Sequence, residues 1–228
     1  ELICPAQRVQ SIFHFAGRRA MDIEGLGERV IEDLVALGFV KSPADLYALT
    51  VADFAEMRRR ADERDGTTPE TVKAGKVATR WAENLIESID HSRATTLERF
   101  LYALGIEHVG ESTAKALAAW FGRLQLIRHL PWPLLKLVPD IGGEVARSID
   151  HFFTQEGNQS AIDELLMRGV NLKDEHDVSP KLRQSLGSDC LLASFEIPKL
   201  TGKRATQLAA AFEDLERVAH VPEHQLVT

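Results

Sequence analysis

Apolar and small residues recur along this chain in one spacing that appears five times. Each copy has two apolar residues three positions apart, a small residue directly after the second, a small or apolar residue four positions later, and an apolar residue three after that. The copies are Ile23/Leu26/Gly27/Ile31/Leu34, Ala74/Val77/Ala78/Ala82/Leu85, Ile106/Val109/Gly110/Ala114/Leu117, Val138/Ile141/Gly142/Ala146/Ile149 and Ile197/Leu200/Thr201/Ala205/Leu208. Spacings of three and four follow the period of a helix, so each copy predicts a tight turn that leads into a helix.

Strand-type alternation is nearly absent between these copies, and proline and glycine residues such as Pro43, Gly66, Pro131 and Pro180 separate them. We therefore predict an all-α fold made of tandem helix-hairpin-helix repeats. We expect the first unit to pack with the second, and the third with the fourth.

The third and fifth copies match well beyond the shared spacing. Phe121, Leu124, His129, Leu130, Pro131 and Leu135 correspond without a gap to Phe212, Leu215, His220, Val221, Pro222 and Leu226. In the third copy this stretch leads into the next hairpin, so we expect a sixth hairpin after Thr228 in a longer parent protein. The start of the chain at Glu1 fits the same expectation of an excised fragment.

The composition describes a globular chain with an acidic balance. It has 44% hydrophobic and 27% charged residues and a formal net charge of −7, which argues against binding nucleic acid by bulk attraction. No apolar run is long enough to span a bilayer, and Cys4 and Cys190 give no disulfide framework. We expect a cytoplasmic protein without a membrane partner, in which Cys190 is a small core residue.

The glycine-bearing turns have the chemistry of a phosphate site. The first amides of a helix have no intrahelical partner and carry partial positive charge, and glycine lets an anion approach them closely. Such contacts position a protein on DNA without reading its bases and need no excess of Lys and Arg. The candidate DNA-binding residues are Gly25, Leu26, Gly27, Lys76, Arg80, Val109, Gly110, Glu111, Ser112, Ile141, Gly142, Gly143, Thr201, Gly202, Lys203 and Arg204.

The candidate hairpins differ in quality. Ala78 stands in the glycine position of the second, which we expect to be mainly structural although Lys76 and Arg80 lie within reach of phosphates. A single glycine turn is most often an ordinary connection in a helical bundle, but five copies favour anion binding. A protein-interaction scaffold and another tandem-hairpin DNA-repair module stay open as alternatives.

Other suggestive residues have a simpler structural interpretation. Acidic residues directly follow the run Arg58-Arg59-Arg60, so a solvated charged surface is favoured over a phosphate clamp. His220 and His224 have the spacing of a helical metal pair, but Pro222 lies between them and no further ligands are visible. Trp81, Trp120 and Trp132 are expected to pack in cores or at unit junctions rather than to stack on bases.

Three strings resemble the C-terminal half of the bacterial NAD-dependent DNA ligase family. Leu2-Ile3-Cys4-Pro5-Ala6-Gln7-Arg8 is similar to the exit of its four-cysteine zinc finger, Arg18-Arg19-Ala20-Met21-Asp22-Ile23-Glu24-Gly25-Leu26-Gly27 to its first hairpin, and Arg99-Phe100-Leu101-Tyr102-Ala103-Leu104-Gly105-Ile106 to the entrance of its third. The resemblance spans roughly residues 2–172. An insertion-like stretch near residues 57–71 and the segment from about residue 176 onward depart from many family members.

The resemblance implies a non-catalytic part of a ligase that clamps nicked double-stranded DNA in replication and repair. The family's nucleotidyl lysine lies in a Lys-x-Asp-Gly motif, whereas Glu63-Arg64-Asp65-Gly66 lacks that lysine, so no ligation is expected from this chain alone. The family uses NAD, Mg²⁺ and structural zinc; we expect this fragment to bind none of them, with Cys4 as one of four zinc ligands in the parent protein. Further implied partners are the parent's adenylation and OB domains, in a bacterial, nucleoid-associated setting.

The expected organisation follows from the repeat and the resemblance together. Residues 1–20 are the remnant of the zinc finger, and residues 21–172 form a helix-hairpin-helix domain with four hairpins, similar to RuvA domain 2. Residues 173–187 are expected to be a linker. Residues 188–228 are expected to form an additional hairpin-like helical segment that stops before a sixth hairpin.

Overall fold

The computed structural model of the chain describes residues 4–67, 79–185 and 200–212. These residues are mostly helical, which confirms the predicted all-α fold. A parallel pair of two-residue strands, β1 with β2, is the exception. The elements are α1 (Pro5–Ala16), α2 (Glu28–Ala36), the 3-10 helix η1 (Pro43–Ala48), α3 (Val51–Asp65), α5 (Arg80–Ser92), β1 (Ala94–Thr95), α6 (Leu97–Ala103), α7 (Glu111–Phe121), α8 (Leu124–His129), α9 (Trp132–Leu135), α10 (Gly143–Thr154), α11 (Glu156–Met167), β2 (Asn171–Leu172), α12 (Pro180–Ser185) and α14 (Gly202–Phe212).

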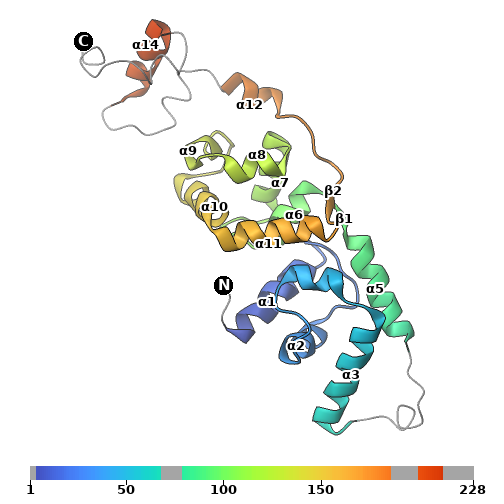
Figure 1. Ribbon diagram of the computed structural model, residues 1–228. Helices are drawn as coiled ribbons and strands as arrows, with labels where there is room; N and C mark the ends of the chain where they lie inside the picture. Colours follow the sequence, from blue (N-terminus) through green and yellow to red (C-terminus); the bar gives the residue numbers. More distant parts are fainter. Residues whose placement is uncertain (1–3, 68–78, 186–199, 213–228) are drawn as a thin grey trace.

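The helices form two groups, which we call the first lobe and the second lobe (Figure 1). The first lobe contains α1, α2, η1, α3 and α5, and the second contains α6 to α11, with α12 and α14 beyond it. Buried apolar residues, including the fully buried Phe15, Phe54, Phe100 and Phe121, form one continuous core through both lobes. The core therefore fixes where the hairpins of each lobe lie.

Local capping explains where two helices of the first lobe begin. Ser42 with Asp45 and Thr50 with Asp53 form reciprocal capping boxes at the starts of η1 and α3. Gly66 then ends α3 in the left-handed conformation, with φ 70°. The starts of η1 and α3 are therefore capped by side chains of the chain itself.

The third and fourth units pack side by side in the second lobe, as the sequence pairing predicted. The Ser148 hydroxyl on α10 donates a hydrogen bond of 2.8 Å to the carbonyl of Glu107, in the turn between α6 and α7. In the first lobe, Leu85 of α5 lies against the turn that precedes α2. The turn of the second unit lies outside the described residues, so only its second helix, α5, is placed.

Arg93 joins the two lobes. Its guanidinium donates to the carbonyl of Tyr47 in η1 at 2.9 Å and to the carbonyl of Arg168 after α11, and it stacks on the Tyr47 ring. Its own carbonyl accepts from the amide of Asn171 at 2.7 Å, at the start of β2. Burial raises the pKa of the Tyr47 hydroxyl to about 12, against the opposing effects of Ser92 and Arg93. The junction is therefore a dense polar contact rather than a loose connection.

The segment predicted as a linker begins with contacts to the second lobe. The amide of His176 donates to the carbonyl of Gly122 at 2.9 Å, and the amide of Ser179 donates to the carbonyl of Trp120 at 3.0 Å. Gly122 has a φ of 71°, and a Cβ on it would clash with the His176 carbonyl oxygen. Residues 173–179 therefore lie along the C-terminal end of α7 before α12 begins.

Candidate nucleic-acid interface

Three hairpins share one backbone conformation. We call residues 22–28 hairpin one, 105–111 hairpin three and 137–143 hairpin four. The middle residue of each turn has a left-handed φ: 82° at Gly25, 64° at His108 and 65° at Asp140. Two residues later, the glycine before each helix is extended, with φ between −75° and −85°. The sequence repeat is therefore also a repeat of backbone geometry.

Buried side chains hold this conformation in place. The two apolar template residues of each turn are at most 7% exposed: Ile23 and Leu26, Ile106 and Val109, Val138 and Ile141. A left-handed φ costs a residue with a Cβ on the order of 1 kcal/mol. Apolar burial offsets that cost at the non-glycine middle residues of hairpins three and four.

The helix starts that follow these turns are open to an approaching anion. Gly27, Gly110 and Gly142 cap α2, α7 and α10 without any side chain that would accept hydrogen bonds from the first-turn amides. A Cβ built on each of them would meet nothing within 4 Å. All three helix starts therefore combine backbone N–H donors with enough room for an anion to approach them.

Two of the candidate amides are already used inside the turns. The amide of Val109 donates to the carbonyl of Ile106 at 3.0 Å, and the amide of Ile141 donates to that of Val138 at 3.2 Å. The amides that remain as candidates for an anion begin one residue later, at Gly110 and Gly142. The apolar side chains Leu26, Val109 and Ile141 are buried, so their part in this surface is to hold the turn.

Hairpin three has a cationic neighbour that the sequence interpretation missed. Arg19, in the loop after α1, forms an ion pair of 2.7 Å with Glu111 at the first position of α7. Arg99 holds that loop by donating to the carbonyls of Arg18 at 2.7 Å and Ala20 at 2.8 Å. Arg19 stands in one of the strings that carried the family resemblance, but no local pattern linked it to a hairpin in a different unit.

Hairpins three and four are adjacent on the surface. His108 of hairpin three lies 3.8 Å from Glu144, the second residue of α10. Ser112 and Gly143, two further candidates, lie in the first turns of α7 and α10. The two open helix starts therefore belong to one continuous region of the second lobe.

Acidic residues line the cavity beside hairpin one. Asp22, Glu24 and Gly25 line a cavity of about 620 Å³ together with Glu87 and His91 of α5. A Cβ on Gly25 would lie 3.0 Å from the Leu85 side chain, so this turn also packs closely against α5. Its backbone resembles that of the other hairpins, but the groups around it differ.

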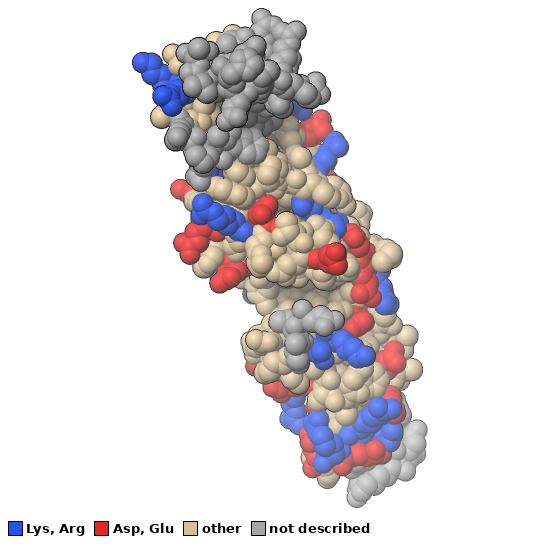
Figure 2. Space-filling view, turned by 60° about the vertical axis from the view of Figure 1, so that its left-hand side comes forward, with Lys and Arg blue, Asp and Glu red and all other residues tan. Residues whose placement is uncertain are grey.

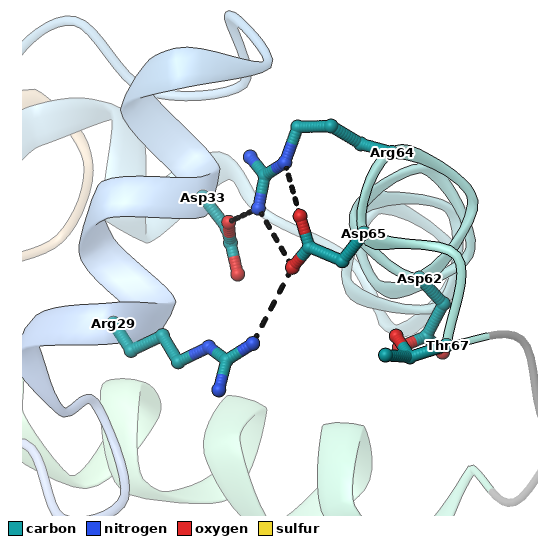
Figure 3. A network of polar contacts seen from close by, with 6 residues as sticks. All are labelled: Arg29, Asp33, Asp62, Arg64, Asp65 and Thr67. Carbon is teal, nitrogen blue, oxygen red and sulfur yellow. Dashed lines mark hydrogen bonds and ion pairs between the residues drawn. The ribbon is translucent and has the colours of Figure 1, made fainter.

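Figure 3 shows how Arg29, the residue directly after hairpin one, is paired. The Arg29 guanidinium, on the first turn of α2, lies 3.4 Å from Asp65 at the end of α3. Arg64 bonds both Asp65 and Asp33, each at 2.8 Å, and its hydrogen bond is the largest cause that lowers the pKa of Asp65. The Asp-Gly pair at residues 65 and 66 therefore belongs to an ion-pair network at a helix end.

The second and fifth hairpins are described only in part. Lys76 lies outside the described residues, and Arg80 is the exposed first residue of α5. Thr201 precedes α14, and its hydroxyl accepts a hydrogen bond from the amide of Arg204 at 3.4 Å, so this helix start is capped by its own side chain. Gly202 and Lys203 are exposed beside it.

The arginine run on α3 is a charged surface, as expected from its acidic neighbours. Arg59 pairs with Glu56 and Glu63, and Arg60 pairs with Glu56. Hydrogen bonds from Arg59 and then Arg60 lower the pKa of Glu56 to about 2. Arg58 stacks on Trp81, which in turn packs edge-on against Phe54.

Charge on the visible face is dispersed. Figure 2 shows Lys and Arg in small groups next to Asp and Glu, with uncharged surface between them. This distribution agrees with the net charge of −7 and with binding by local contacts rather than by a broad basic patch. His220, His224 and Cys190 lie outside the described residues.

Comparison with known proteins agrees with this geometry. A family model described as a helix-hairpin-helix motif matches residues 99–162, which contain hairpins three and four. A DNA ligase of Xanthomonas euvesicatoria is 51% identical over 93% of the chain, and one of Xanthomonas axonopodis is 50% identical over the whole of it. The chain is homologous to bacterial DNA ligases.

The homology extends further than the sequence strings indicated. A DNA ligase of Stenotrophomonas maltophilia is 48% identical over the whole chain, so the segment after residue 172 also aligns with ligases. The expectation that many other family members depart from the chain at about residue 176 stays a prediction. The chain spans about a third of the length of the curated ligases it matches. No helix among the described residues is long and apolar enough to cross a membrane.

Proposed function

We propose that this chain is the part of a bacterial NAD-dependent DNA ligase that grips nicked duplex DNA through its sugar-phosphate backbone while the nick is sealed in replication and repair. The observation that carries the proposal is the repeated open helix start at Gly110 and Gly142, within the region that matches the helix-hairpin-helix motif. Contacts of this kind are independent of base sequence.

The chemical step of ligation is assigned to the rest of the parent protein. The only Asp-Gly pair of the chain is preceded by Arg64 and Glu63 rather than by the lysine of a Lys-x-Asp-Gly motif, and Asp65 is held by two arginines. The adenylation and OB domains of the parent protein are the partners that this function requires. We place it at the nucleoid of a bacterial cytoplasm, where the nicked DNA is.

The described residues do not supply a complete structural zinc site. Cys4 is exposed at the start of α1 and supplies one thiol, whereas a structural zinc site needs about four donors. Within residues 4–67, 79–185 and 200–212, no three His, Cys, Asp or Glu side chains are placed to hold a metal ion. We therefore assign NAD, Mg²⁺ and zinc to the parent protein and derive no step of this chain through them.

The test measures the affinity of the 228-residue chain for nicked and intact duplexes of unrelated sequence. Fluorescence anisotropy reports the binding at two salt concentrations. We expect affinity for both duplexes, little dependence on sequence, and weaker binding at higher salt because phosphate contacts release counterions. A Gly142→Leu variant is expected to fold and to bind more weakly. If the unsubstituted 228-residue chain does not bind DNA at low salt, the result would instead support a protein-interaction scaffold.

A further inference from the structure

Hairpin four has an aromatic side chain that contacts two cations from different elements. The Trp132 ring, at the start of α9, lies 5.2 Å from the Lys136 ammonium nitrogen and 4.4 Å from the Arg147 guanidinium carbon. Lys136 directly follows α9, and Arg147 lies in the second turn of α10. The negative face of an indole attracts cations, so the Trp132 ring brings together one cation from before the turn and one from after it.

The guanidinium lies directly beside the open helix start. Arg147 Nη1 is 3.3 Å from the point that a Cβ on Gly143 would occupy. Gly143 does not have a left-handed φ, so its backbone does not require glycine. The absence of a side chain at residue 143 instead leaves room for the guanidinium over the first turn of α10.

This arrangement is not required by the fold, because hairpin three lacks it. The matching positions in the third unit are Phe100, Leu104 and Lys115 in place of Trp132, Lys136 and Arg147. Phe100 is fully buried, whereas Trp132 is only partly buried and Arg147 is exposed. The cation-aromatic-cation group is therefore an addition to hairpin four at the surface.

The group favours an anionic ligand. Lys136 and Arg147 are both positively charged, and each has several N–H donors. The phosphodiester of duplex DNA offers single charges with exposed oxygens, which a guanidinium and an ammonium bind as hydrogen-bond donors. The first-turn amides of α10 lie close to the Arg147 guanidinium, because the Cβ position of Gly143 is 3.3 Å from it.

We propose that Trp132 is a positioning residue that holds Lys136 and Arg147 against the DNA phosphate at hairpin four. The inference rests on the proposed function, since it assigns particular side chains to the same interface. Trp132 itself contacts no base in this scheme. Its contribution is to hold two flexible side chains in place before DNA arrives, so less side-chain entropy is lost on binding.

The test combines Trp132→Leu, Trp132→Phe and the double variant Lys136→Gln/Arg147→Gln in the full chain, with nicked-duplex affinity measured across salt concentrations. Removing both cations is expected to reduce the slope of log affinity against log salt by about 0.9, because together they bind one phosphate. Trp132→Leu is expected to weaken binding by about tenfold, and Trp132→Phe to restore most of it because phenylalanine also attracts cations.

The decisive measurement is Trp132→Leu in the background that lacks both cations. There we expect no further loss of affinity, because the ring has nothing left to position. An equal loss in both backgrounds, or no loss in either, would overturn the inference while leaving the proposed function intact. If the unsubstituted chain does not bind DNA, the proposed function itself would be overturned.

Two controls test whether the effect on DNA binding depends on where the cation lies, and whether the variants still fold. Arg123→Gln removes a cation that pairs with Asp177 just after the C-terminal end of α7, away from the open helix starts, and is expected to leave the salt slope unchanged. Thermal unfolding is followed for each variant. If Trp132→Leu does not fold, the double variant and Trp132→Phe still test the two cations and the ring, and an unchanged salt slope in the double variant would refute the proposal.

Discussion

Hairpins one and four have the same backbone and different surroundings. Gly25 and Asp140 share a left-handed φ, and Gly27 and Gly142 share an extended one. The turn of hairpin one borders an acidic cavity, whereas hairpin four has two cations gathered on Trp132. The repeat therefore specifies where amides are presented, and residues outside the repeat decide how an anion is received there.

The largest effect is expected from aspartate at the open helix starts of the second lobe. Aspartate is a good helix N-cap, and a Cβ at these positions meets nothing within 4 Å, so Gly110→Asp/Gly142→Asp should fold normally. The carboxylates would occupy the amides and repel phosphate, which should reduce affinity for nicked duplex by about 100-fold. Anisotropy titration measures this loss.

Gly27→Asp is the matched control in hairpin one. It introduces the same residue into the same backbone, next to groups that are already acidic. We expect it to weaken binding by less than about threefold, since the acidic neighbours should already disfavour a phosphate there. Equal losses in the two lobes would show that the surroundings do not matter.

The second largest effect concerns the junction between the lobes. Arg93→Met removes the hydrogen bonds to Tyr47 and Arg168 and leaves two carbonyls without this donor. The free energy of unfolding should fall by about 2 kcal/mol, as for other hydrogen bonds from charged groups. If the second lobe carries most of the affinity, DNA binding should change little. A large loss of affinity with an intact fold would mean that duplex binding requires both lobes to be held in a fixed relative position.

A smaller effect on stability is expected at the turn of hairpin one. Gly25→Ala places a Cβ at a φ of 82° and 3.0 Å from Leu85, which should cost about 1 kcal/mol in the free energy of unfolding. Urea denaturation measures the change, and Gly157→Ala on α11, where a Cβ meets nothing within 4 Å, should be neutral or slightly stabilising. Unchanged stability in Gly25→Ala would mean that the turn relaxes easily.

The smallest effect tests whether hairpin one can be strengthened. Asp65→Asn removes the carboxylate that pairs with Arg29 and should raise DNA affinity about twofold, because the arginine becomes available to phosphate. Asp62→Asn changes the net charge equally on the same helix but contacts Thr67 instead of an arginine. Equal affinities of the two variants would assign the effect to net charge alone.

Much of the fold was accessible from the sequence. The apolar spacing predicted helices after residues 27, 110, 142 and 201, and α2, α7, α10 and α14 begin there. Buried residues at fixed spacing determine a helix and its preceding turn locally, because both depend on contacts within one unit. The second turn and much of the fifth unit lie outside the described residues, so those expectations stay predictions.

The surroundings of the candidate site were decided by tertiary contacts. Arg19 reaches hairpin three from another unit, and Arg147 meets Trp132 across the turn of hairpin four. The sequence interpretation assigned Trp132 to packing, named Arg19 only within a string that carries the family resemblance, and did not name Arg147. These groups come together only when separate helices dock, since no spacing along the chain encodes which side chains will face each other.

The sequence by itself therefore determined the unit of this protein, a turn with a small residue before an amphipathic helix, because apolar burial within one repeat is enough to fix it. Tertiary structure alone decided which of these units are open, which are acidic and which have cations beside them. The physical reason is that an electrostatic environment depends on distances between elements, and only the packing of the core sets those distances.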